Sequence, residues 1–396
     1  MTGGLEEHLF RREHARIVAA LTRRFGLALA EDVAQDAYCR ALEVWRVHGI
    51  PDNPAAWLTT TAQRRAIDLL RRAATAERLA PEIEHEVEAA FEPSAIRDEQ
   101  LRMMFACCQP RLAEEVQLAL VLNILCGFGA VEIAGAFLAG RAAIEKRIAR
   151  GKQELAHDRD ALELAAAEVP ERVATVQRAL YLLFSEGYHG TSAVRAELCA
   201  EAIRLVALLA ELPAAATPTT HALAALMCLH AARLPARIDA DGELNAFADQ
   251  DRAHWDRGLV AAGLDHFEHS ASGTALTGYH VEAAIAAVHA SAASADRTDW
   301  AAIVGLYDRL SQIAPSPVVA LNRAIAIGRR DGAARGLAEL HAIADKDRLA
   351  RYPFYAAALG ELELELGHAD AARDYFAAAH ALARNEAERR FLAKRM

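Results

Sequence analysis

The sequence has few of the features that mark a membrane, secreted or zinc-binding protein. Its 396 residues contain no apolar run long enough to span a bilayer, and the N-terminal stretch lacks the basic start and apolar core of a signal peptide. Six cysteines are present, none in a CxxC spacing. We therefore expect reduced, mostly buried thiols without disulfides, in a cytoplasmic protein that has no contact with a membrane.

Motifs for catalysis and cofactor binding are also lacking. The sequence has no Gly-rich phosphate loop, no nucleophile elbow and no HExxH, since the HFEH at residues 266–269 has the wrong spacing. The acid-rich segment from residue 239 to 256 lacks the spacing of a twelve-residue calcium loop, in which a glycine and a closing glutamate stand at fixed positions. We expect a capped, ion-paired loop there. The sequence predicts no enzymatic activity, no cofactor and no metal site.

Aromatic residues and positive charge are both scarce. Aromatic residues make up 6% of the chain and apolar residues 53%, with alanine abundant. This composition favours an all-α fold packed through small side chains. The formal net charge of −10 argues against a protein that binds DNA unaided, because cationic contacts to phosphates supply most of that affinity. Any DNA contacts should be local and supported by a partner.

The most informative stretch runs from residue 31 to 72. Apolar residues recur at steps of three and four from Leu29 to Trp45, which predicts a helix with one buried face. Its other face is acidic, with Asp32 and Asp36 one turn apart. Such a like-charged pair destabilises a helix slightly, so we expect this face to bind a basic protein partner.

A second, basic helix is predicted from residue 55 to 72. Asn53 suits its cap and Pro54 its first position, where a missing N–H costs nothing. Its arginines and the threonine row at 59–61 suit contacts with phosphates and bases. A solvated amphipathic helix would carry a similar charge pattern, so charge alone does not decide between the two interpretations.

Residues 129–155 read as a helix-turn-helix. The first helix is expected at about 130–137, the turn at 138–140 and the second helix at 141–155. In such motifs the N-terminal residues of the second helix reach base edges, while later basic residues hold phosphates. The burial pattern leaves five side chains outward, Arg141, Ala142, Glu145, Lys146 and Ala149, and these are flanked by Arg147, Arg150 and Lys152.

Near the C-terminus, residues 352–385 carry the spacing of a tetratricopeptide repeat, from Leu359-Gly360 to Phe376. We find one clear repeat, and Pro315-Ser-Pro317 followed by VVALNRAIAIGRRDG resembles a degraded neighbour. We expect the clear repeat to pack on the preceding helices. All other segments after residue 158 are helical in pattern.

The wording of these stretches resembles a known family. AEDVAQDAYCRALEVW followed by PDNPAAWLTTTAQRRAIDLLRR resembles region 2 of an extracytoplasmic-function (ECF) sigma factor, a small member of the sigma-70 family, and the helix-turn-helix resembles region 4. The resemblance implies that region 2 docks on the β′ clamp helices of core RNA polymerase and reads the minus-ten element of promoter DNA. It implies that region 4 reads the minus-thirty-five element and touches the β flap.

Carried onto this sequence, the resemblance implies three groups of site residues. The core polymerase-binding residues would be Asp32, Gln35 and Asp36. The minus-ten DNA-binding residues would be Asp52, Asn53, Thr59, Thr61, Arg64 and Arg65. The minus-thirty-five DNA-binding residues would be Arg141, Glu145, Lys146, Arg147 and Arg150.

The rest of the chain, with LYLLFSEGY, LCAEAIRL and PSPVVALNRAIA, resembles the long-tailed group of these sigma factors, whose C-terminal repeat-like domain acts as the regulator. We therefore expect an all-α chain with region 2 at 1–75, an acidic linker at 76–98, region 4 at 99–157 and a regulatory extension at 158–396. The extension is expected to contact the sigma domains within the same chain.

Two other classes of function stay open. A helix-turn-helix transcriptional regulator would bind its operator without polymerase, and the acidic balance argues against it. A tetratricopeptide-like interaction scaffold would work through its tail after decay of the front half, and the intact basic helix argues against that.

Overall fold

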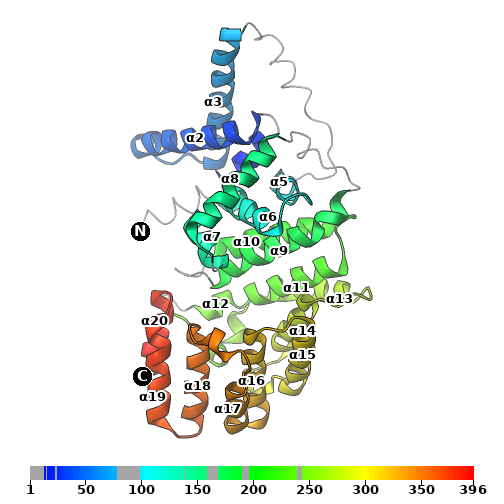
Figure 1. Ribbon diagram of the computed structural model, residues 1–396, viewed down its shortest axis with the longest axis vertical. Helices are drawn as coiled ribbons and strands as arrows, with labels where there is room; N and C mark the ends of the chain where they lie inside the picture. The colour runs from blue at the N-terminus through cyan, green and yellow to red at the C-terminus, as the bar shows by residue number, and fades with distance from the viewer. Residues whose placement is uncertain are drawn as a thin grey trace. The chain divides into compact units, whose positions relative to one another are not determined.

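The computed structural model describes residues 13–14, 16–22, 25–77, 99–137, 139–157, 168–189, 196–238 and 243–396. In these ranges every regular element is a helix, and one isolated bridge joins Ile238 to Leu244 (Figure 1). The prediction of an all-α fold is confirmed. No helix in the described ranges combines the length and apolar character that a membrane crossing needs. The expected linker at 76–98 lies almost entirely outside the described residues.

The chain divides into two compact units. The first holds Met1–Leu183 with Glu211–Ala215, and the second holds Phe184–Ala210 with Ala216–Met396. The sequence placed the start of the extension at residue 158. In the structure, helix α9 (Val169–His189) begins in the first unit, where Arg172 Nη1 donates to the Phe105 carbonyl at 3.1 Å. Arg178 pairs with Glu114 at 2.8 Å, so the first part of α9 packs with the residues expected to form region 4.

In the first unit, α2 (Leu27–His48) and α3 (Pro54–Glu77) pack on one another through small side chains. Gly26, with φ +80°, separates α2 from the helical residues before it. The Asn53 side chain accepts the Ala56 N–H at 3.0 Å, and Pro54 is the first residue of α3. The predicted cap is therefore confirmed. Trp45 and Trp57 meet edge to face, 5.5 Å between ring centroids, and close the helix pair at its loop end.

The remaining helices of this unit form a small bundle. They are α5 (Glu99–Cys107), α6 (Glu114–Leu120), the π-helix η1 (Val121–Leu125), α7 (Ala130–Phe137) and α8 (Arg141–His157). Helix α8 buries Ile144, Gly151 and Leu155, as its periodicity predicts, whereas Ile148, which the same periodicity places on the buried side, is half buried. A Cβ on Gly151 would lie 2.6 Å from the Leu120 side chain, which shows how closely α6 and α8 approach.

The second unit begins with the last residues of α9, from Phe184. It continues with α10 (Ala196–Glu211), of which all but the last residue belongs here, and α11 (Pro218–Ala231). Helix α11 is apolar on almost all sides and packs against α13 and α14. In the segment between α11 and α13, Asp251 and Asp256 each cap a helix by accepting a backbone N–H group. Asp251 caps the 3-10 helix η5 and Asp256 caps α13. The elements from residue 234 to residue 297 are α12 (Leu234–Arg237), η4 (Phe247–Asp249), η5 (Arg252–His254), α13 (Arg257–Ser270), α14 (Gly278–Ser291) and η6 (Ala295–Arg297).

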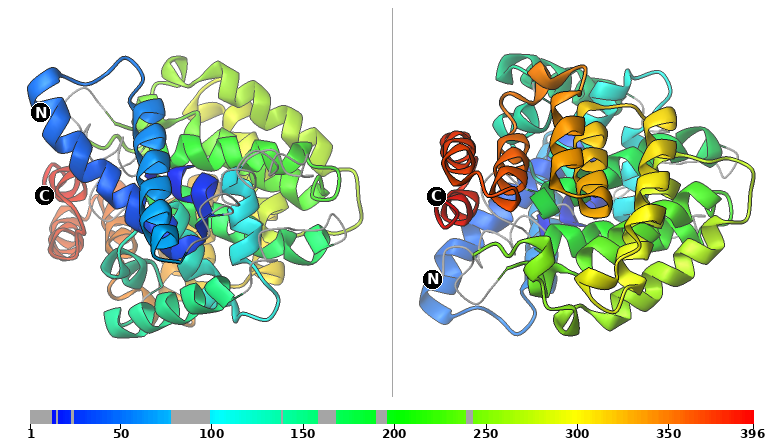
Figure 2. Two further views of the ribbon diagram at one scale, coloured as in Figure 1. Left: turned by 90° about the horizontal axis from the view of Figure 1, so that it is seen from above. Right: turned by 90° about the horizontal axis from the view of Figure 1, so that it is seen from below.

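The C-terminal helices form a succession in which each packs on the next, from α14 to α20 (Figure 2). They are α15 (Trp300–Ile313), α16 (Pro317–Asp331), α17 (Ala333–His341), η7 (Lys346–Leu349), α18 (Pro353–Glu365), α19 (Ala369–Ala381) and α20 (Glu386–Ala393). In the α18–α19 pair a Cβ on Gly360 would lie 2.9 Å from the Phe376 ring, the contact that the repeat spacing implies.

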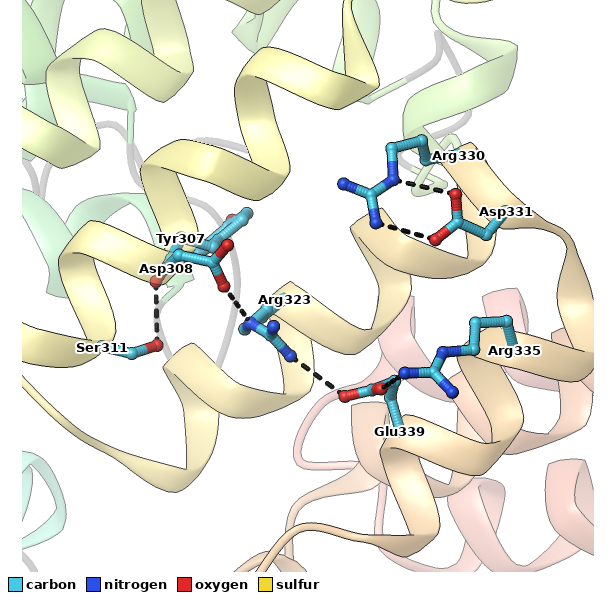
Figure 3. Close-up of polar contacts among 8 residues, drawn as sticks. All are labelled: Tyr307, Asp308, Ser311, Arg323, Arg330, Asp331, Arg335 and Glu339. Atoms are coloured by element: carbon cyan, nitrogen blue, oxygen red, sulfur yellow. Dashed lines mark hydrogen bonds and ion pairs between the residues drawn. The ribbon is translucent and has the colours of Figure 1, made fainter.

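The α16–α17 pair is a second helical hairpin of this kind. A Cβ on Gly336 would lie 2.7 Å from the Cα of Gly328, so the two backbones nearly touch. Arg323 of α16 also bonds Asp308 of α15 at 2.6 Å and Glu339 of α17 at 3.0 Å (Figure 3). The sequence indicated one clear repeat and one degraded neighbour, whereas the structure places several hairpins in series.

The Gly328–Gly336 contact generates a prediction about stability. Gly336→Ala should lower the free energy of unfolding by about 1–3 kcal/mol, because a backbone atom cannot move aside for the new methyl group. The measurement is urea denaturation of the full chain. The matched control is Gly305→Ala in α15, where nothing lies within 4 Å of the added Cβ, and there alanine should stabilise by up to about 1 kcal/mol. Equal stabilisation by both variants would refute the close approach.

A second prediction concerns pH. His289 lies between Phe247 (4.6 Å) and Trp300 (5.4 Å), and burial, together with Arg233 and Arg252, lowers its pKa to about 4. Since the unfolded chain binds this proton below its ordinary pKa of 6.5, stability should fall as pH drops through 6.5 toward 4. From about pH 7 to about pH 5 the loss from this group should be about 1–2 kcal/mol.

His289→Phe should reduce that pH-dependent loss by the same amount, as measured by thermal unfolding at the two pH values. His254→Phe, at an exposed histidine, is the control and should leave the loss unchanged. An unaltered pH dependence in the His289 variant would contradict the proposed burial effect.

Candidate functional site

The acidic face of α2 is exposed in the first unit. The side chains of Asp32, Gln35 and Asp36 all reach solvent, while Val33 and Ala37 on the other face are fully buried. Asp32 and Gln35 also line a cavity of about 570 Å³. The structure therefore places the three predicted core-binding residues together on one accessible surface.

One ion pair joins two predicted sites. Arg65 Nε of α3 donates to Asp36 Oδ2 of α2 at 2.8 Å, and both side chains are close to half exposed. The sequence assigned Asp36 to polymerase and Arg65 to DNA, and it gave no sign that they meet. An exposed pair of this kind contributes at most about 1 kcal/mol, so either partner can be released at small cost.

The predicted minus-ten residues lie along α3 and the loop before it. Thr59 donates its hydroxyl to the Ala55 carbonyl at 2.9 Å, and Thr61 donates to the Trp57 carbonyl at 2.8 Å. These bonds fix the rotamers and leave the hydroxyl lone pairs available to a donor. Arg64 and Asp52 are exposed. Asn53 acts locally as the helix cap described above.

The predicted minus-thirty-five residues lie on α8. Arg141, Glu145, Lys146 and Arg150 are exposed, and Arg147 is half buried. Arg141 Nε donates to Glu145 Oε1 at 2.7 Å, so the two form one polar group near the start of the helix. Helix α8 therefore buries its apolar side and leaves its basic side open to solvent.

Helix α7 begins without a serine or threonine that could cap it, since Gly129 precedes its first residue. The Glu132 carboxylate accepts the Gly129 N–H at 2.8 Å, so the chain satisfies one terminal donor from within the helix. Half of a capping box is thereby kept without the usual residue.

Sequence reasoning missed two polar contacts between distant residues. Lys152 Nζ of α8 pairs with Glu31 Oε1 of α2 at 2.6 Å, across 121 positions of sequence. In the second unit, His221 Nδ1 lies 3.0 Å from His266 Nδ1, and burial lowers the pKa of both imidazoles. Among the residues that the structure describes, no group of three potential ligands is arranged to hold a metal ion.

Two parts of the chain match known protein families, and most of its length matches one known protein. Residues 9–75, which include α2 and most of α3, match the family described as Sigma-70 region 2. Residues 172–271 match a family of unknown function, DUF6596. Over 388 residues the chain is 38% identical to an uncharacterized protein of Rhizobium meliloti (strain 1021), covering 95% of this chain and 91% of that protein.

The fold and the region 2 match define the class as transcription initiation factors, which are not enzymes. The match of residues 9–75 supports a sigma factor of the sigma-70 family, and the chain shares nearly its full length with the Rhizobium meliloti relative. Family membership implies binding to core RNA polymerase and to promoter DNA. The roles of the individual residues stay predictions.

Proposed function

We propose that the chain is an ECF-type sigma factor, in which α2 docks on the β′ clamp helices and α3 with its preceding loop captures the minus-ten element. The observation that supports this most directly is the exposed acidic face of α2 beside the exposed basic side of α3. One surface would hold a protein and the adjacent surface would hold a melted strand.

In this proposal, α8 supplies the second DNA contact and reads the minus-thirty-five element. The exposed residues Arg141 and Lys146 stand near its N-terminus, where a recognition helix meets base edges. Two weak DNA contacts held by one polymerase act as a single strong one, because the second contact forms at high effective concentration. This resolves the conflict between an acidic chain and DNA binding.

The docking surface can be tested by charge reversal. Asp32→Arg should weaken binding to purified core enzyme by at least about 30-fold, the effect of losing a central interface residue. Asp36 is the poorer choice for this test, because its reversal would also disturb Arg65. Binding is measured by fluorescence anisotropy of the labelled full chain.

The matched control is Asp370→Arg in α19, a reversal at a side chain that is 97% exposed. It should leave core binding unchanged. Core binding by the Asp32 variant equal to that of the control would show that α2 docks elsewhere. Promoter binding by the protein alone in a gel shift would favour a regulator that works without polymerase.

We propose further that the C-terminal extension regulates the sigma domains. Its support is its length and its series of hairpins, an architecture that offers extended binding surfaces. Truncation after His189 preserves the contacts of Arg172 and Arg178 with the first unit and removes most of the second unit.

The truncated chain should give a run-off transcript level that differs at least about fivefold from that of the full chain, since regulatory couplings are typically about 1–3 kcal/mol. Circular dichroism and core binding serve as controls for the fold of the truncated chain. A folded, core-binding truncation with unchanged transcript levels would remove the regulatory role.

A further inference from the structure

Two histidines of the second unit bring the same ring nitrogen together from two helices. His221 lies in the first turn of α11 and His266 lies toward the end of α13, and their Nδ1 atoms are 3.0 Å apart. Both side chains are half buried, so protein atoms hold the rings in place while solvent still reaches them. Both residues fall within the range 172–271 that matches the family of unknown function.

The helices that carry the pair are packed closely on both sides of it. A Cβ on Gly263 would lie 2.7 Å from the Leu229 side chain, and a Cβ on Gly273 would lie 3.0 Å from Pro218. Side chains on packed helices hold a ligand geometry better than side chains on loops. The separation of the two nitrogens is therefore set by the contact between α11 and α13.

This separation has the size expected for two ligands of one metal ion. Two nitrogens that each lie about 2.0–2.1 Å from a metal are about 2.8–3.0 Å apart at neighbouring corners of a square or octahedron, and about 3.3–3.4 Å apart in a tetrahedron. The observed 3.0 Å agrees with the first arrangement. It favours Ni²⁺ or Cu²⁺, which accept imidazole in tetragonal sites, over tetrahedral Zn²⁺.

The surroundings of the pair also suit a cation. A metal ion binds the neutral imidazole, and burial lowers the pKa of both histidines, against the opposing effect of the Asp265 carboxylate. That carboxylate places negative charge beside the two rings. His269 stacks on His221, with 5.2 Å between ring centroids, and covers one face of that ring.

We propose that His221 and His266 form a two-ligand site for a tetragonal divalent transition metal, Ni²⁺ or Cu²⁺, which joins α11 to α13. Without the metal, one Nδ1–H donates to the other Nδ1. With the metal, both rings carry their proton on Nε2 and both Nδ1 atoms bind the ion. Among the described residues no third ligand is arranged with them, so water takes the remaining positions. The site uses no residue of α2, α3 or α8.

The first experiment titrates the full chain, made without a histidine tag, with nickel chloride in a calorimeter. Because the chain contains 16 histidines, variants identify the site. His221→Gln and His266→Gln should each weaken the tightest Ni²⁺ site at least about tenfold, since even partners outside the ligand set typically contribute that much. His341→Gln, at an exposed histidine of α17, is the matched control and should leave this affinity unchanged.

The second experiment counts the coordinated imidazoles in the parent chain and so does not depend on the folding of a variant. Substoichiometric Cu²⁺ is added to the full chain, and electron spin echo envelope modulation should show two imidazoles on the ion. Circular dichroism checks the fold of each variant used in the titration.

Two imidazoles on Cu²⁺, together with weaker Ni²⁺ binding by both folded variants, would support the site. Equal Ni²⁺ affinity in the parent chain and in either folded variant would overturn it, and so would a Cu²⁺ spectrum with a single imidazole. If the variants do not fold, the imidazole count in the parent chain decides. Binding to core polymerase is measured separately, so failure of the metal site leaves the proposed function standing.

Discussion

Close approach of helices through small side chains is the constraint on which the rest of the structure depends. Fully buried alanines line the contact between α2 and α3, including Ala34, Ala37 and Ala62. Glycines allow similar contacts elsewhere, at Gly151 against Leu120 and at Gly263 against Leu229. Because these contacts bury backbone as well as side chains, packing of each helix needs only a narrow stripe, and the other faces are free to carry charge.

Charges on those free faces then meet across the helix contacts. Asp36 with Arg65, and Glu31 with Lys152, pair residues of adjacent helices within 2.8 Å. In the second unit, Arg323 ties together three consecutive helices in the same way (Figure 3). Small contact residues bring the helix axes close, so long side chains from neighbouring helices reach one another.

The separation of a buried apolar stripe from exposed charged faces on each helix explains which features could be predicted from the sequence. The helical period and the cap residues predicted α2, α3 and α8 because these signals are local, and the structure confirms the cap at Asn53 and the buried side of α8. The placement of the candidate site residues on exposed faces was equally accessible, since burial follows the same period. The π-helix at Val121–Leu125 has no such local signature and was missed.

Contacts between helices could not be predicted from the sequence, for a physical reason. Periodicity identifies the polar face of a helix, but not the helix that this face meets. The Asp36–Arg65 and Glu31–Lys152 pairs span 29 and 121 positions, and their carboxylates resembled free interface charges. The hairpin at Gly328 and Gly336 was indicated only as a degraded neighbour of the repeat, because glycine meets glycine there, without the aromatic partner that marks the repeat at Phe376.

The Asp36–Arg65 and Glu31–Lys152 ion pairs affect both the affinity and the specificity with which this acidic surface would bind a partner. In the structure Glu31 pairs with Lys152 and Asp36 pairs with Arg65, so each carboxylate is neutralised by a cation of the chain itself. A partner that docks there exchanges one ion pair for another, so the net gain in free energy is small. A partner without well-placed cations would leave desolvated carboxylates unpaired, at a cost of several kcal/mol. For a partner that docks on this face, the internal pairs thus lower the affinity while preserving the penalty against wrong partners, and additional contacts must supply the remaining binding energy.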